Sequence, residues 1–440
     1  MNTVPDTGEF RLTPWVVFRA SHGVKVVKGK IQVVGLPSDV VLPGFDLEDV
    51  RSIKPNRPLD EIVLRKERYA VKNEQPFDWP AWQRNMSELS ERQQSTTVSK
   101  VRKQAGVPFD DRQTFARVQT AYDLDVMRMS RILAVGAGGA ASWLEELTRA
   151  GVSQFVLLDH DKVTETNLAT QQTYRRDIGR FKVDCIAERI LDINPGANVI
   201  ALPKRLDDLT DYEIRQYAFD PIGNREASRS VICGLTDNFF AQARVNRLAL
   251  KFGLPSLCAQ VYKEGRGGEV TFTFPGITPA CHRCALNSRY RYFLEQGQHN
   301  DVTSDGTPIF STTRLNAIKG FVMLALLHHG SNHPRWGKML VRIGNRNLVL
   351  VRMDPDIEQT LGMPFFSKVL KKADQQRLFF DEVVWLPQEP DCPENGFATC
   401  PDCGGTGDLT NAIGKFRDTT QLVETNVPKA MVDFMSKYSN

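Results

Sequence analysis

The 440-residue sequence predicts an α/β fold with a mostly parallel sheet, and two observations support that prediction. Short apolar runs alternate with amphipathic segments between about residues 110 and 265. The first of these runs also ends in a cluster of glycines, which is typical of the first turn of nucleotide-binding α/β domains. Because ligands of such sheets bind beyond the carboxyl ends of the strands, we expect the functional site at that edge.

Each expected element follows from an apolar run or a helical spacing. Strands are expected at 131–137, 154–161, 229–235 and 255–261, and helices at 140–152, 183–194 and 241–254. Further along, residues 312–329 predict one buried helix, and residues 347–353 and 378–386 predict two strands. Strands that alternate with helices favour a parallel sheet covered on both faces.

The chain is too long for one average domain, and its composition divides it into three parts. Residues 1–105 form a smaller N-terminal α+β region, with strands expected in 14–36 and a helix in 76–92. Residues 106–405 hold the α/β domain, and residues 406–440 are a polar tail that we expect to be loosely held. The first part suggests an accessory role in binding a partner, without a chemistry of its own.

Charge and hydropathy narrow the class of protein. A net charge of +4 is too mild to favour a nucleic-acid partner, which usually requires a concentrated basic patch. Apolar runs reach nowhere near the roughly 18 residues of a membrane span, and the N-terminus has no secretory pattern. Four of the eight cysteines form two CxxC pairs, which in such a chain favours metal over disulfides. We expect a cytoplasmic protein in a reducing compartment.

The glycine cluster predicts a phosphate-binding turn. The expected strand at 131–137 runs into Gly136, Gly138 and Gly139, and a helix follows. Glycine lets the backbone turn tightly and approach phosphates, and the free N–H groups of the helix start then face the anion. One helix later a strand ends in Asp159, where a carboxylate can accept ribose hydroxyl protons. On these residues alone an NAD-binding domain is the leading interpretation, and glycines that only permit close packing are the structural alternative.

Further polar residues point away from hydride transfer. Asp161, Asn167 and Gln171 follow Asp159, and Lys182 stands at the start of the next helix. Asp237 follows the strand expected at 229–235, where a carboxylate can hold Mg²⁺. One lysine for phosphate charge and one carboxylate for a metal are what nucleotidyl transfer to a carboxylate requires, because the leaving pyrophosphate must be neutralised.

In this order and spacing, the motifs resemble those of the ThiF/MoeB-like, ubiquitin-activating-enzyme-type adenylating superfamily. The resemblance covers roughly residues 110–405 and rests on VGAGGAAS, LLDHDKVTETNLATQQ, GRFKVD, INP, GLTDN and the two CxxC pairs. It implies a Rossmann-like adenylation domain that uses ATP and Mg²⁺, with a structural zinc. The roles that it implies are an ATP loop at Gly136, Gly138 and Gly139, ribose binding by Asp159, phosphate contacts by Asn167 and Lys182, and magnesium binding by Asp237.

The resemblance also implies a reaction and partners. The expected enzyme is a ubiquitin-like modifier activating enzyme, which adenylates the C-terminal carboxylate of a ubiquitin-like protein, releases pyrophosphate and passes the modifier to a conjugating enzyme. A homodimer is implied, in which Arg112 reaches the ATP of the neighbouring subunit; a surface salt bridge of Arg112 is the alternative. Other open possibilities are a peptide, a sulfur carrier or a tRNA base as the substrate, a catalytically dead scaffold, and a nicotinamide enzyme.

Two departures from the family pattern concern charge and sulfur. Thr170 stands where the family usually has a phosphate-binding arginine, and Arg175, Arg176 or Arg180 could substitute for it. No cysteine lies between Cys284 and Cys392, so a thioester could form only on a thiol from elsewhere, for which Cys392 is a candidate. The remaining cysteines fall in helix or strand patterns and suggest small buried residues; they are Cys185, Cys233 and Cys258.

The two CxxC pairs predict a structural zinc site. Cys281 with Cys284, and Cys400 with Cys403, each place two thiolates on one tight turn, and two such turns complete a tetrahedral site. A closed four-sulfur site leaves no position for a catalytic water. Two redox-active dithiols are the alternative. Cys392 could be a spare thiol, a competitor for zinc or a nucleophile.

Overall fold

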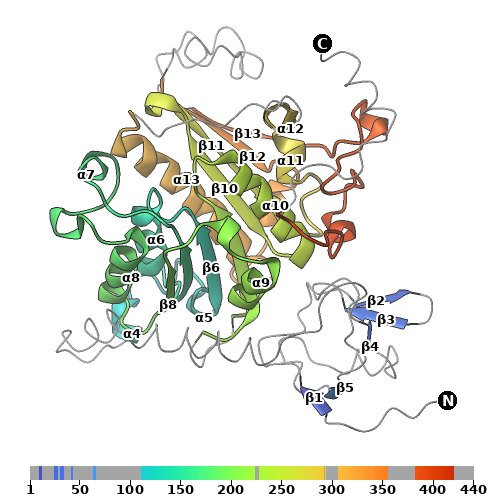
Figure 1. Cartoon of the computed structure of the whole chain (residues 1–440), viewed down its shortest axis with the longest axis horizontal. Coiled ribbons are helices and arrows are strands. Elements are labelled where there is room, and N and C mark those ends of the chain that lie inside the picture. The colour runs from blue at the N-terminus through green and yellow to red at the C-terminus, as the bar shows by residue number, and fades with distance from the viewer. Residues whose placement is uncertain are drawn as a thin grey trace.

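The computed structural model describes residues 111–222, 227–291, 293, 306–354 and 382–420, together with five short strands of the first 110 residues (Figure 1). Among these strands, β1 (Glu9–Arg11) pairs antiparallel with β5 (Val63–Arg65). The strands β2 (Val24–Val27), β3 (Lys30–Val33) and β4 (Val41–Leu42) form a second small antiparallel sheet. Two of them lie within the segment 14–36 for which strands were predicted, whereas the helix predicted at 76–92 lies outside the described residues.

One eight-stranded mixed sheet forms the centre of the α/β domain, in the order β13-β12-β11-β10-β9-β6-β7-β8. Strands β10, β9, β6, β7 and β8 run parallel, and β11, β12 and β13 continue the sheet antiparallel. The bounds are β6 Ser130–Val135, β7 Gln154–Leu158, β8 Asn198–Leu202, β9 Arg229–Gly234, β10 Ser256–Val261, β11 Gly267–Thr273, β12 Leu348–Arg352 and β13 Glu382–Leu386. The predicted fold class, a mostly parallel α/β sheet, is confirmed.

Helices cover both faces of this sheet, because its central strands are apolar on both sides (Figure 1). One face is covered by α8 (Lys182–Ile193), α6 (Ala141–Arg149) and α13 (Ile309–His328), which share a core around Trp143, Ile190 and Met323. The opposite face is covered by α9 (Asp211–Phe219) and α10 (Phe239–Phe252). Since α6 packs against both α8 and α13, it lies between them.

Short helices connect these elements. They are α4 (Asp111–Thr114), α5 (Leu124–Arg128), α7 (Asn167–Thr170), α11 (His282–Ala285), α12 (Asn287–Tyr290) and α14 (Met339–Ile343), with 3₁₀ turns η3 (Arg175–Asp177), η4 (Leu206–Asp208), η5 (Lys263–Gly265), η7 (Pro393–Asn395) and η8 (Leu409–Ala412). Within the described ranges, no helix is long and apolar enough to cross a membrane.

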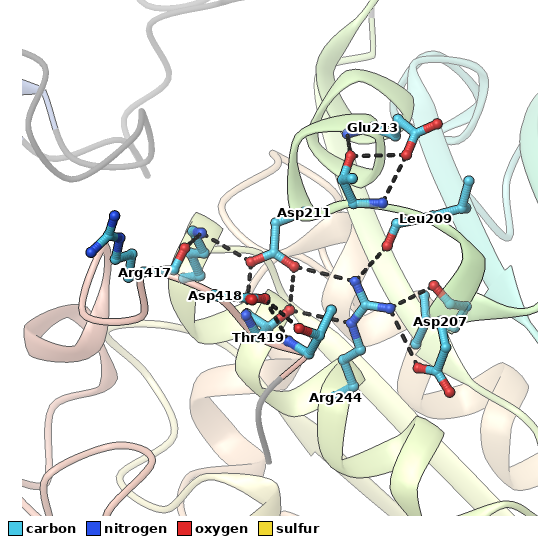
Figure 2. A network of polar contacts seen from close by, with 12 residues as sticks. Asp207, Leu209, Asp211, Glu213, Arg244, Arg417, Asp418 and Thr419 are labelled. Carbon is cyan, nitrogen blue, oxygen red and sulfur yellow. Dashed lines mark hydrogen bonds and ion pairs between the residues drawn. The ribbon is translucent and has the colours of Figure 1, made fainter. Parts of the chain in front are cut away.

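The segment after residue 405 is packed rather than loose as far as it is described, so the expectation of a loosely held tail is wrong for residues 406–420. Leu409 and Ala412 are buried next to the cysteine pairs. Further on, both the backbone N–H and the hydroxyl of Thr419 donate to the Asp211 carboxylate at the start of α9 (Figure 2). Buried hydrogen bonds thus hold the segment at Thr419, while most of its other polar residues are exposed to solvent.

Asp211 is the centre of a buried ion network that joins three segments (Figure 2). Its carboxylate lies 2.9 Å from the Lys251 Nζ and 3.3 Å from an Arg244 nitrogen, and both cations belong to α10. The Arg244 guanidinium also donates to the backbone oxygens of Leu206 and Leu209, in and directly after η4. The network thus fixes the loop between β8 and α9 relative to α10.

Candidate functional site

In the turn after β6, two of the three glycines, Gly136 and Gly138, leave no space for a side chain. Gly136 has a φ of +83°, and a Cβ there would lie 2.7 Å from the Thr236 Cβ. A Cβ on Gly138 would lie 2.5 Å from the Lys182 Cδ. Within the described chain, no side chain caps the following helix α6, whose Ncap residue is Ala140. The N–H groups of its first turn are therefore available to an anion.

Asp159 joins this turn to the end of β7. Its Oδ2 accepts the Gly138 N–H at 2.8 Å, and its Oδ1 accepts the Asp161 N–H at 2.9 Å. Burial raises the pKa of the Asp159 carboxyl, and these N–H groups together with Lys182 oppose that effect. Each carboxylate oxygen has a second lone pair, so Asp159 keeps the capacity to accept a ribose hydroxyl.

Lys182 and Asp161 form an ion pair at the edge of the site. Lys182 is the first residue of α8, its side chain is 8% exposed, and its Nζ lies 3.0 Å from the Asp161 Oδ2. The Lys182 backbone N–H also donates to the Asp161 carbonyl. The ion pair holds the ammonium against Gly138 and offsets its charge within the protein.

Asp237 lies where β9 ends and α10 begins. The Asn238 side chain caps α10 by accepting the Ala241 N–H, and the Thr236 hydroxyl accepts the Asn238 N–H. Gln242 donates to the Thr236 carbonyl and holds the turn from the α10 side. The rigid turn presents the exposed Asp237 carboxylate at the carboxyl edge of the sheet, and a carboxylate in such a position fits the oxygen ligation that Mg²⁺ prefers.

These groups line one cavity of about 450 Å³ at the carboxyl ends of β6, β7, β9 and β10. Its volume lies in the range of small-molecule sites. Most of the predicted site residues line it, namely Gly136, Gly139, Asp159, Asp161, Gln171, Lys182 and Asp237, whereas Gly138 lies behind the Lys182 side chain. The Gln171 Oε1 is buried and has no hydrogen-bond partner among the described residues, so it is available to a ligand donor.

The structure does not bring Asn167, Arg112 or Cys392 to the cavity wall. The Asn167 side-chain oxygen accepts from the N–H and the hydroxyl of Thr164, a local arrangement at the start of α7. Arg112 is exposed on α4, so its predicted contact with a neighbouring subunit stays a prediction. Cys392 is buried at the start of η7, one residue from an N–H that contacts the Cys284 sulfur.

The three arginines proposed from the sequence do not replace the charge absent at Thr170. Thr170 itself lines the cavity, whereas Arg175, Arg176 and Arg180 do not. Arg180 is engaged by Glu188, which forms a two-point contact with it. The positive groups that line the cavity besides Lys182 are instead Lys204, Arg205, Lys263 and Lys319. The sequence prediction missed all four, although Lys319 is the single lysine within the helix predicted at 312–329.

The four cysteines of the two CxxC pairs converge on one point. Their sulfurs lie within 4.8 Å of one another, with separations of 3.8 Å from Cys281 to Cys284 and to Cys400, and 3.5 Å from Cys284 to Cys403. Four thiolates around a tetrahedral zinc at about 2.3 Å are separated by roughly 3.8 Å, so the donor set fits zinc. Hydrogen bonds from neighbouring thiols lower the pKa of the Cys400 and Cys403 thiols, which favours the thiolate that a metal needs, whereas the pKa of the Cys281 and Cys284 thiols is raised.

The cysteine cluster is linked to α10. Asp402, between the last two cysteines, is fully buried and accepts from Asn246 and Arg247 of that helix. His282 does not contribute to the cluster: its Nδ1 pairs with the Thr271 hydroxyl, and burial lowers its pKa to about 3. The cluster therefore stabilises the helix whose N-terminal turn presents Asp237.

A parallel sheet with a glycine turn, an open helix N-terminus and convergent polar groups at its carboxyl edge defines a nucleotide-binding domain of the Rossmann-like α/β class. The ThiF family model matches residues 111–355, more than half of the chain, and the chain belongs to the ThiF family. The family part of the sequence-based recognition is therefore confirmed.

The chain is similar to several curated relatives over part of its length. It is 27% identical over 169 residues to the NEDD8-activating enzyme E1 catalytic subunit of Arabidopsis thaliana, covering 37% of this chain and 36% of the relative. It is 29% identical over 164 residues to the molybdopterin-synthase adenylyltransferase of Salmonella typhimurium, covering 36% of this chain and 60% of the relative. The chain thus spans less than two thirds of the length of these relatives.

Among solved structures, the chain is similar to E. coli MccB crystallised with AMPCPP and MccA. The two share 15% identity with a TM-score of 0.40, over 56% of this chain and 70% of that chain.

Proposed function

We propose that this chain is an ATP-dependent activating enzyme that adenylates the C-terminal carboxylate of a ubiquitin-like protein. One observation supports the proposal most directly: the uncapped N-terminus of α6, Lys182 and Asp237 all border a single cavity. These groups supply positive charge for phosphates and a ligand for a divalent cation in one place. The relatives whose names include an activating enzyme and an adenylyltransferase agree with this reaction class.

The nucleotide would bind with its phosphates at the glycine turn. The first-turn N–H groups of α6 and the Lys182 ammonium border that position, and Gly139, where a Cβ would meet nothing within 4 Å, leaves room for close approach. Asp159 would accept the ribose hydroxyls, and the unpartnered Gln171 Oε1 would accept a further donor of the nucleoside. Lys182 would exchange part of its contact with Asp161 for a phosphate oxygen.

Asp237 is the residue that would hold Mg²⁺, because its exposed carboxylate borders the cavity on a fixed turn. When bound, the metal supplies charge neutralisation for the phosphates and makes the α-phosphorus more electrophilic. Asn238 and Thr236 keep the carboxylate in place through the cap of α10.

In the reaction, an oxygen of the acceptor carboxylate attacks the α-phosphorus of ATP. The bond from that phosphorus to the bridging oxygen breaks, and pyrophosphate leaves with the electron pair. The products are an acyl-adenylate and pyrophosphate. Because the attacking group is already a carboxylate, the step needs no general base, and the work of the protein is orientation and charge stabilisation.

No cysteine lines the cavity in the described part of the chain, so none of these thiols is placed to receive the acyl group after adenylation. Cys233 and Cys258 are fully buried in strands, and burial raises the pKa of each thiol. We therefore propose that the acyl-adenylate is the product handed on, with the next nucleophile supplied by a partner such as a conjugating enzyme. The same observation favours a second candidate, in which a short peptide is the acceptor.

Exchange of labelled pyrophosphate into ATP tests the proposal. The purified chain would be mixed with Mg·ATP, labelled pyrophosphate and candidate acceptors encoded near its gene, each supplied as the folded protein and as a peptide copy of its last residues. Exchange with the folded protein alone is the expected result. Exchange with the peptide alone favours the second candidate, and an acceptor whose carboxylate is blocked as an amide must give none.

A further inference from the structure

Lys319 is a buried cation that faces the nucleotide cavity. It lies on α13 and is 4% exposed, yet it belongs to the cavity wall. Thr312 and Leu315 precede it at spacings of seven and four residues, on the same face of the helix, and also line the cavity. This face of α13 is therefore a wall of the site, and Lys319 is its charged residue.

No described residue neutralises this charge by direct contact. The Lys319 Nζ lies 5.0 Å from the centroid of the Trp143 ring, and it forms no ion pair or hydrogen bond within the described ranges. Burial lowers its pKa to about 8, while Glu146 of α6 and Cys233 of β9 act in the opposite direction without contacting it. A buried ammonium without a partner is unfavourable unless an anion compensates it.

The position of α13 is fixed relative to the glycine turn. The Asn316 amide, one turn before Lys319, donates to the Ser142 hydroxyl at 2.7 Å, and Ser142 belongs to the first turn of α6. Because α6 lies between α8 and α13, Lys182 and Lys319 approach its N-terminus from opposite sides. Lys182 is already paired with Asp161, so Lys319 is the cation of the two that no carboxylate of the described residues contacts directly.

We propose that Lys319 binds a phosphate oxygen of the nucleotide, on the side of α6 opposite to Lys182. The proposal rests on the proposed function to the extent that Mg·ATP fills this cavity. An oxyanion is the ligand that the site requires, because an ammonium and a helix N-terminus both offer N–H donors and positive charge. The acceptor carboxylate is the other oxyanion of the reaction, and the experiment separates the two.

Binding constants of Mg·ATP and of adenosine, measured by calorimetry without an acceptor, test the assignment. Lys319→Met is expected to weaken Mg·ATP binding by roughly 10- to 100-fold, as expected for a lost charge-assisted contact. Adenosine, which has no phosphate, should bind Lys319→Met and the wild type equally. Lys319→Arg keeps the charge and should recover most of the affinity, and Lys338→Met, at an exposed position before α14, should change nothing.

Unchanged Mg·ATP affinity in Lys319→Met would overturn the proposal and would leave the acceptor carboxylate as the oxyanion for this residue. Equal losses of ATP and adenosine affinity would overturn it too, because they would indicate a structural role. Thermal unfolding of each variant, run in parallel, identifies a change in fold. If Lys319→Met weakens Mg·ATP binding as expected, but no acceptor supports pyrophosphate exchange in the wild type, the proposed reaction is wrong and the assignment of Lys319 to a phosphate still holds.

Discussion

The backbone N–H of Gly138 donates to the Asp159 carboxylate at 2.8 Å, so the turn after β6 and the end of β7 are held together by one hydrogen bond. The same carboxylate accepts the Asp161 N–H, and Asp161 in turn pairs with Lys182. A continuous polar chain therefore runs from the glycine turn to the first residue of α8. These contacts fix the relative positions of the groups proposed to bind ribose and phosphate before any ligand arrives.

Asp237→Ala should abolish pyrophosphate exchange, with a loss of at least about 10²-fold, because the removed carboxylate is the proposed magnesium ligand. The fold should persist, since Asp237 is exposed at the start of α10. Exchange rates across a magnesium titration provide the measurement. Asp192→Ala, at an exposed position on α8, is the matched control, and full activity in the Asp237 variant would refute the metal assignment.

Cys284→Ser should remove bound zinc and lower stability by about 4 kcal/mol, or roughly 10 °C in the unfolding midpoint, because the site closes a long loop and supports α10. Cys392→Ser, a change of another buried thiol in the same region, should keep the metal. Elemental analysis of both purified variants compares them directly. Equal zinc content in the two would contradict the four-cysteine site.

Two aspartates that contact Arg244 should differ widely in their contribution to stability (Figure 2). Asp211→Ala should cost about 3–5 kcal/mol, since its side chain is 11% exposed and its loss leaves Arg244 and Lys251 buried without their carboxylate. Asp207→Ala should cost less than about 1 kcal/mol, because that side chain is 77% exposed. Urea unfolding of both variants measures the difference, and similar values would contradict the role of the network.

Lys319 should make stability without nucleotide depend on alkaline pH. Its pKa is lowered from 10.5 to about 8, so the folded state carries a penalty below pH 8 that disappears as pH rises from 8 to 10.5. Lys319→Met should therefore stabilise the protein at pH 7, by an amount on the order of 3 kcal/mol, and this gain should shrink towards pH 10.5. Urea unfolding of the wild type and of Lys319→Met at pH 7, 8.5 and 10 measures the difference in unfolding free energy. A difference that stays constant with pH would contradict the lowered pKa of Lys319.

Sequence patterns were sufficient for most of the fold. The apolar runs of β6, β7, β9 and β10 and the helical spacings of α6, α8 and α10 predicted these elements closely. The prediction missed β8, α9 and β11. The five residues of β8 are a short run, α9 contains mostly polar residues, and β11 begins with two glycines that resemble a turn. The two strands depend on pairing with strands already in the sheet, and α9 depends on packing against its face, which no local pattern expresses.

The site also contains some residues that local sequence patterns predict and others that depend on tertiary packing. Asp159, Lys182 and Asp237 were predictable because each directly follows a strand or begins a helix beside the carboxyl edge. Lys319 was not, because its place at the cavity depends on the packing of α13 against α6, far away in sequence. Asn167 is the reverse case. The motif selected it as a site residue, but in the structure its side-chain oxygen accepts a hydrogen bond from Thr164.

A crystal structure with magnesium and a non-hydrolysable ATP analogue tests the central claim most directly. We expect the triphosphate at the N-terminus of α6, between Lys182 and Lys319, with the metal on Asp237 and the ribose on Asp159. An analogue bound outside this cavity, or a nicotinamide cofactor retained within it, would contradict the account.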